Sequence, residues 1–153
     1  MEAYLDFLTE LGALFTQLSD LEREKMTAVQ AGDLDGLNGC IRREQALGLS
    51  LRGVDRKRET MLEELGLTGV SLRQLPDRCP PELQPRAKAV TEDLRRRYEV
   101  LNASRESARM MLECHLHKLE HRLEELGAPQ DLEPGYRPAP VDLPPGMRTD
   151  FHA

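Results

Sequence analysis

Three residues in the last third of the chain have the types and spacing of a metal site. Cys114, His117 and His121 follow one another at intervals of three and four residues, which places them on one face of a helix. A histidine pair at this spacing can bind Zn²⁺ or Ni²⁺. A zinc site needs further ligands, however, and no HExxH or similar motif accompanies the pair. We therefore interpret these side chains as exposed polar residues and predict neither a metal nor a cofactor.

A basic segment in the same region is the second candidate for chemistry. Its arginines are Arg95, Arg96, Arg97, Arg105 and Arg109. Acidic residues lie among them at helical spacing, a pattern typical of ion pairs on a solvated helix face. The whole chain has a formal net charge of −6 and a pI near 5.3. Because a nucleic-acid surface needs a basic face to neutralise phosphates, no nucleic-acid partner is expected.

No arrangement of catalytic residues stands out in the remainder of the chain. There is no glycine-rich phosphate loop, nucleophile elbow or Ser/His/Asp pattern. Glu44 and Arg58 interrupt an otherwise apolar helical stripe, but they are too far apart on one helix to meet. Pairing with groups on neighbouring helices, which sets the register between helices, is the more natural role for them. We predict that the protein is not an enzyme and has no catalytic residues.

The composition indicates a helical bundle of one domain. The 153 residues are 39% hydrophobic and 31% charged, with no tryptophan and only 4% aromatic residues. A core of this composition is built from Leu, Val, Met and Ala, as in long helix bundles. Apolar residues recurring at intervals of three and four predict helices over about residues 3–31, 33–65 and 83–126.

Short connections determine how these helices are arranged. Gly32 suits the left-handed position that ends a helix, and Asp33 suits the N-cap of the next one. A link of two or three residues forces the first two helices to be antiparallel, with one long bent helix as the alternative. Residues 66–82 form a connector, with a short turn expected over 70–75. The predicted fold of residues 1–127 is thus an all-α, elongated antiparallel three-helix bundle or coiled coil.

The end of the chain differs from the rest in composition. Gly127 and Pro129 end the long third helix. Residues 128–153 are rich in proline and have no helical period, which predicts a flexible, disordered C-terminal tail. The alternative is a segment that becomes ordered on a partner.

The third helix is longer than the other two, and this difference suggests a binding surface. In an up-down-up arrangement its surplus of about ten residues projects ~15 Å past the turn at Gly32. That surplus carries a row of leucines, here called the leucine stripe: Leu112, Leu116, Leu119, Leu123 and Leu126. An uncovered apolar surface of this kind usually marks an interaction site. We expect a partner to bind there, with Tyr136 of the tail closing over it, unless a shifted register or the tail itself covers the stripe.

The N-terminal residues and the cysteines indicate the compartment. The sequence MEAYLDFLTELG carries acids where a signal peptide has basic residues. No apolar run approaches the ~20 residues of a membrane span, so no membrane insertion is expected. An odd number of cysteines (Cys40, Cys79 and Cys114) does not suggest a secreted disulfide framework. A cytoplasmic location is the simplest interpretation.

Several short motifs recur in the order and spacing of a known family. They are ERE at residues 22–24, GDL at 32–34, REQ at 43–45, DRKR at 55–58, LGL at 65–67, SLRQL at 71–75 and LN at 101–102. Over about residues 3–126 the chain resembles the FlgN-type flagellar export chaperones. One departure is Arg105, which stands where the family's LNxxN segment has its second Asn.

The resemblance implies a small helical protein of the flagellar type III export system. Such chaperones bind hook-associated proteins (FlgK/FlgL-like), shield their terminal helical segments and deliver them to the export apparatus, without catalysing a reaction. The leucine stripe could accept such an amphipathic helix in helix-in-groove fashion. The competing function is a structural or adaptor coiled-coil protein that forms a homodimer through the same stripe.

Overall fold

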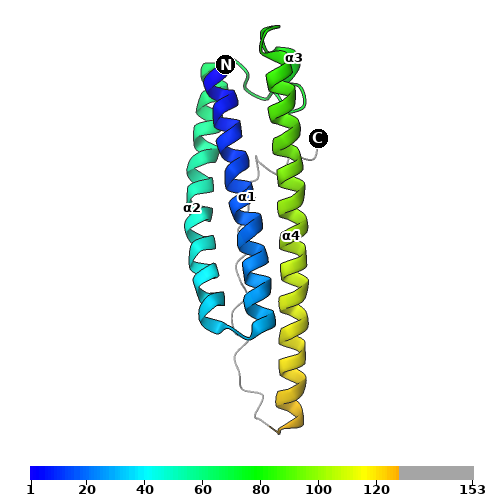
Figure 1. Cartoon of the computed structure of the whole chain (residues 1–153). Helices are drawn as coiled ribbons and strands as arrows, with labels where there is room; N and C mark the ends of the chain where they lie inside the picture. The colour runs from blue at the N-terminus through cyan, green and yellow to red at the C-terminus, as the bar shows by residue number, and fades with distance from the viewer. Residues whose placement is uncertain (128–153) are drawn as a thin grey trace.

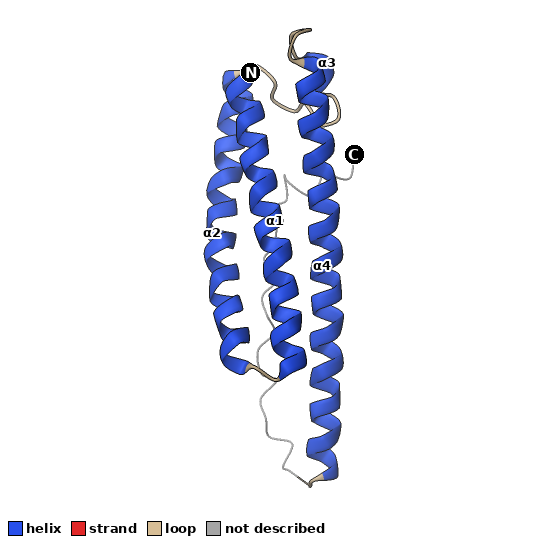
Figure 2. Ribbon diagram, viewed as in Figure 1, coloured by secondary structure: helices blue, strands red, loops and turns tan. Residues whose placement is uncertain are grey.

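The computed structural model describes residues 1–127, which form four helices (Figures 1 and 2). They are α1 (Glu2–Ala31), α2 (Leu34–Glu64), the single-turn α3 (Leu75–Arg78) and α4 (Gln84–Glu125). No strand occurs in this part of the chain, which confirms the all-α class. Residues 128–153, including Tyr136, lie outside the described residues, so the predicted tail and its boundary remain predictions.

A tight turn separates α1 from α2 and reverses the chain direction (Figure 1). Gly32 adopts a left-handed conformation with φ 69°, and its N–H donates to the carbonyls of Ala28 and Val29. The Asp33 side chain then accepts a 2.9 Å hydrogen bond from the Gly36 N–H and caps α2. A Cβ at Gly36 would lie only 2.2 Å from that carboxylate, so glycine makes room for the cap. The two helices are therefore distinct and antiparallel, not one bent helix.

Helix α1 is the central helix and lies between α2 and α4 (Figure 1). The most deeply buried apolar side chains of α1 are Tyr4, Leu5, Leu8, Leu11, Phe15 and Leu18. Leu51 of α2 and Leu94 and Leu101 of α4 pack into the same core. The rings of Phe15 and Tyr98 have centroids 5.7 Å apart. The main helix contacts join α1 to α2, α1 to α4 and α3 to α4, so α1 holds the other two long helices together.

The connector contains the predicted turn, and the single-turn helix α3 follows it directly. The carbonyl of Ser71 accepts hydrogen bonds from the N–H groups of Gln74 and Leu75, which closes a turn within the predicted range 70–75. Helix α3 then begins at Leu75 and contains Pro76 in its first turn, where the sequence predicts no helix. Proline is tolerated at that position because the first N–H groups of a helix have no intrahelical acceptor. Leu72, Leu75 and Cys79 are buried, and α3 packs against α4 near its start. The connector thus closes the end of the bundle where α4 begins.

Polar contacts fix α4 parallel to α1. Arg86 donates to Asp6, and Arg97 Nη1 donates to Thr16 Oγ1 at 2.9 Å. These pairs are separated by 80 and 81 residues, which puts the end of α1 level with about Leu112. Helix α4 continues to Glu125 and therefore extends ~20 Å past the α1–α2 turn, as Figure 1 shows.

Candidate partner-binding surface

The leucine stripe occupies the part of α4 that extends past the α1–α2 turn. Leu116 is 48% exposed, Leu119 55%, Leu123 37% and Leu126 82%. Leu112, level with the end of α1, is half-buried. The last fully buried residue of α4 is Ala108. The stripe therefore becomes exposed at the point where α1 stops covering α4.

One face of α4 is buried up to about residue 108 and exposed after residue 112, where α1 has ended. On a straight helix the leucines of the stripe continue the angular positions of Leu94, Leu101 and Ala108, which α1 buries. Among the described residues, nothing replaces α1 beyond residue 112. A contiguous row of exposed leucines on a soluble helix is uncommon and is typical of an interaction surface. The geometry suits a second helix that takes the place of α1.

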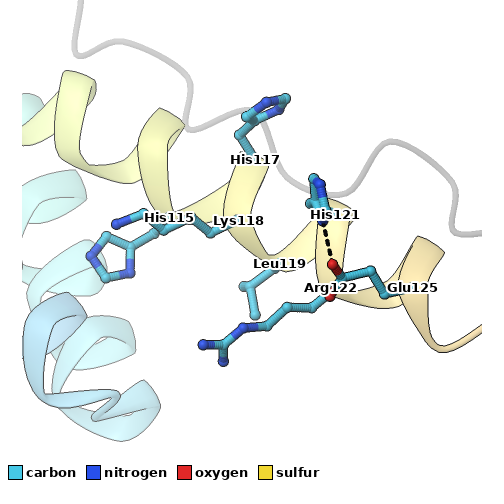
Figure 3. Close-up of a pocket in the computed structure, with 7 residues that line it drawn as sticks. All are labelled: His115, His117, Lys118, Leu119, His121, Arg122 and Glu125. Carbon is cyan, nitrogen blue, oxygen red and sulfur yellow. Dashed lines mark ion pairs between the residues drawn. The ribbon is translucent and has the colours of Figure 1, made fainter.

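The candidate metal ligands lie on a different side of α4 from the stripe. In Figure 3, His117 and His121 project away from Leu119. His117 lies 3.8 Å from Glu120, and His121 lies 3.4 Å from Glu125. Cys114 is exposed. Within residues 1–127 no three metal-ligating side chains come together. The side chains of His117 and His121 are 85% and 66% exposed, in line with the exposed polar residues expected from the sequence.

The hollow drawn in Figure 3 also belongs to this exposed surface. Its described lining comes from α4 alone: His115, His117, Lys118, Leu119, His121, Arg122 and Glu125. Leu119 is the only apolar residue among them, so the hollow adjoins the leucine stripe and its other described lining residues are polar or charged. It does not gather convergent catalytic groups.

Comparison with known families identifies the chain. A family model described as FlgN protein matches residues 1–138. The chain belongs to the FlgN family. This confirms the resemblance predicted from the motifs, and it associates the protein with flagellar chaperones rather than enzymes. No curated protein and no solved structure matches the chain.

In this FlgN-family protein, four charged residues from three helices meet just above the exposed part of α4. We call Glu22, Lys25, Glu44 and Arg105 the charged cluster. Lys25 Nζ lies 2.9 Å from Glu22 and donates to Glu44 at 2.7 Å. Arg105 Nε lies 3.8 Å from Glu22. Glu22 and Lys25 are 2% and 6% exposed, so the cluster joins α1 to both α2 and α4 from inside the bundle.

Burial and pairing shift the protonation equilibria of the charged cluster. Desolvation raises the pKa of Glu22, and it outweighs the lowering by Lys25. Desolvation alone would lower the pKa of Lys25, but hydrogen bonds to Glu22 and Glu44 outweigh it and raise that pKa. Lys25 is therefore held firmly charged between two carboxylates.

The sequence predicted only one member of the charged cluster, Glu44, as an inward residue pairing with a neighbouring helix. Glu22, Lys25 and Arg105 were missed as partners. The sequence does contain an indication of these contacts, because residues of opposite charge occupy core heptad positions on the helices that pack together around Lys25. Arg58, the other inward charge, is buried and lies 3.6 Å from Asp55 on its own helix.

Most of the arginine-rich segment forms the local ion pairs that its spacing predicts. Arg96 and Arg97 both bind Asp93, at 2.7 and 2.6 Å. The hydrogen bond from Arg96, with that from Arg97, lowers the pKa of Asp93 despite some desolvation. Arg109 binds Glu113 at 2.9 Å. These contacts stabilise α4 and leave little basic surface for a polyanion.

None of the helices in residues 1–127 combines the length and apolar character needed to cross a membrane.

Proposed function

We propose that this FlgN-family chaperone binds an amphipathic terminal helix of a flagellar hook-associated protein along the leucine stripe. It acts in the cytoplasm, prevents premature assembly of its client and delivers it to the type III export apparatus. The observation that supports this proposal is the exposure of four leucines on an extension of α4 that no described residue covers. Family membership supports a flagellar chaperone role in general.

The physical basis is apolar burial on a preformed helix. Each Å² of apolar surface removed from water contributes ~25 cal/mol. Ordering the client's segment offsets part of this gain, which keeps the complex reversible and allows release for export. The binding residues are Leu112, Leu116, Leu119, Leu123 and Leu126. Tyr136 closing over the partner is part of the proposal, as is the absence of any catalytic step, metal or cofactor.

The test measures binding to the terminal helix of a FlgK-like subunit by calorimetry. Replacing Leu116, Leu119 and Leu123 by Ser should weaken binding on the order of a thousandfold, since each buried leucine contributes ~1.5 kcal/mol or more. Helix content should stay unchanged, because these side chains are exposed.

A matched control changes exposed leucines elsewhere. Leu34 and Leu49 of α2 are 72% and 67% exposed, and replacing both by Ser should leave binding unaltered. A truncation at about residue 115 removes every leucine of the stripe except Leu112, together with the tail. If the truncated protein folds and binds the client as tightly as the full chain, the binding site lies elsewhere.

The second candidate function is an adaptor coiled-coil protein, supported by the same exposed stripe. A homodimer through the stripe would bury the same leucines. Light scattering with and without the client separates the two functions. A stable dimer that ignores the client favours the adaptor, and a monomer that forms a defined heterocomplex favours the chaperone.

A further inference from the structure

We infer that the leucine stripe accepts one short helix of a different protein, which runs parallel to α4 in the line of α1 and carries acidic residues along one edge and basic residues along the other. We also infer that a second copy of this chain does not fit there. The inference rests on the proposed function, because it takes the stripe as the binding surface.

The two edges of the stripe differ in charge, because one carries two glutamates and the other carries Arg122. The intervals of four and three residues between its leucines make them core heptad positions. Glu113 and Glu120, directly after Leu112 and Leu119, occupy e positions and form one edge. His115 and Arg122, directly before Leu116 and Leu123, occupy g positions and form the other edge. Figure 3 shows His115 and Arg122 projecting to the same side of α4. A helix paired with α4 has its own flanking residues beside these edges. Its residues beside the glutamate edge must therefore be basic, and its residues beside the edge with Arg122 must be acidic.

The charged edges remain able to bind a partner. Arg122 has no ion pair among the described residues, and Glu120 has only the 3.8 Å contact with His117. Glu113 is bound by Arg109 at 2.9 Å, but both side chains are at least 61% exposed, and such surface pairs exchange readily. The occupant's charges can therefore be recognised.

The upper end of the stripe is closed. Above Leu112 the same face of α4 is covered by α1, which ends at the turn between α1 and α2 (Figure 1). A helix on the stripe therefore cannot continue along α4 and must end at this turn. The available length, from Leu112 to Leu126, fits about fifteen residues or ~20 Å of helix. This geometry favours a helix with a free end.

Neither orientation suits a second copy of the chain. In a parallel pair, the copy's own α4 would have to continue upward into the space occupied by α1. An antiparallel pair avoids this collision. In that orientation, however, e positions face e positions and g positions face g positions, so each edge of α4 meets the same edge of the copy. Glu120 would face its own counterpart, and Arg122 would face His115. The carboxylates of the two Glu120 residues repel each other, and Arg122 has no carboxylate opposite it, so the pairing is disfavoured.

The turn also selects the direction of the occupant. Asp33 and Asp35 lie at the start of α2, and α1 ends there with its carbonyl groups. The N-terminus of a helix carries partial positive charge and is favoured next to such groups, whereas a C-terminus is not. The occupant then runs parallel to α4, as α1 does. In that direction its e positions face His115 and Arg122, and its g positions face Glu113 and Glu120.

Two peptides of identical composition test the inference on the full chain. Each has about fifteen residues, the length of the stripe, with leucines at the core positions. The matched peptide carries Glu at e and Lys at g, and the exchanged peptide carries the reverse. By fluorescence anisotropy the matched peptide should bind on the order of tenfold more tightly at low ionic strength, and the ratio should shrink in high salt.

A charge-exchange variant provides the reciprocal measurement. Replacing Glu120 by Arg together with Arg122 by Glu keeps the composition of the protein and exchanges the edges at the centre of the stripe. Both side chains are exposed, so circular dichroism should show an unchanged fold. The variant should bind the exchanged peptide more tightly than the wild type does, and the matched peptide less tightly.

Each remaining outcome is decisive. Equal affinity for both peptides overturns the inference but leaves the proposed function standing, since the stripe still binds helices. Tighter binding of the exchanged peptide overturns the parallel direction. Failure of both peptides overturns the stripe as a binding surface. A stable dimer in light scattering that Leu119→Ser abolishes overturns the exclusion of a second copy.

Discussion

Replacing Lys25 by Met tests how strongly the charged cluster stabilises the bundle. Methionine keeps the length and the apolar stem of the side chain but removes the ammonium group. Glu22 would then lose its 2.9 Å partner and keep only Arg105 at 3.8 Å, and Glu44 would lose its 2.7 Å hydrogen bond. Two carboxylates would then lie in the bundle without the ammonium group that now binds both of them.

The expected loss of unfolding free energy is ~3 kcal/mol. Removing one partner of a buried ion pair costs ~3–5 kcal/mol because the other charge stays buried without compensation. The lower end applies here, since Arg105 remains and the raised pKa of Glu22 makes it easier for that carboxyl to take up a proton. Such a loss is a large part of the ~5–15 kcal/mol by which domains are stable.

Chemical denaturation at neutral pH, followed by helical circular dichroism, measures the effect. Lys88→Met on the exposed face of α4 is the matched control and should change the unfolding free energy by less than ~0.5 kcal/mol. Adding Glu22→Gln and Glu44→Gln to Lys25→Met should recover most of the loss, because no uncompensated charge is then buried. A loss below ~1 kcal/mol for Lys25→Met, or one equal to that of the control, would refute the reasoning.

Three further outcomes follow from the same contacts. Leu101→Ala should cost ~2–5 kcal/mol because that side chain is 0% exposed, whereas Leu119→Ala on the same helix should cost less than ~0.5 kcal/mol, and thermal melts giving similar losses would contradict the burial difference. Asp33→Ala should cost ~1 kcal/mol by removing the cap of α2, and denaturation showing no loss would mean that the cap is dispensable. Because pairing raises the pKa of Lys25, its stabilising contribution is present below its ordinary value of 10.5 and is lost as the pH rises through the folded value. Wild-type unfolding free energy should therefore fall more steeply above pH 10.5 than that of Lys25→Met, and parallel curves would exclude this linkage.

The long helices could be predicted because their signals are local. Gly32 and Asp33 each determine a backbone conformation without help from distant residues, and the interval of three and four between apolar residues defines one helix face. The helix ends observed in α1, α2 and α4 lie within two residues of the expected ones. The helical turn through Pro76 could not be predicted, because proline both breaks helices and starts them, and only the packing of α3 on α4 decides between the two.

The arrangement of the helices depended on information that no single segment contains. The length difference between α4 and its neighbours predicts that leucines such as Leu116 and Leu119 extend past the turn, and their exposure agrees with this. Which residues meet across helices depends on the register, however. The contact of Arg105 with Glu22 joins residues whose common level is set only when α4 packs against α1. Charges at core positions are therefore recognisable from the sequence, but their partners are not.

The charged cluster and the leucine stripe are connected through that register. If α4 slipped by one heptad along α1, either Leu112 or Tyr98 would occupy the place of Arg105, and Glu22 would lose that cation. A slip toward α3 would also cover part of the leucine stripe with α1, which apolar burial alone would favour. The buried charges oppose this gain, because an unmatched carboxylate inside the bundle costs several kcal/mol. The charged cluster therefore keeps α4 in the register in which Leu116, Leu119 and Leu123 stay exposed.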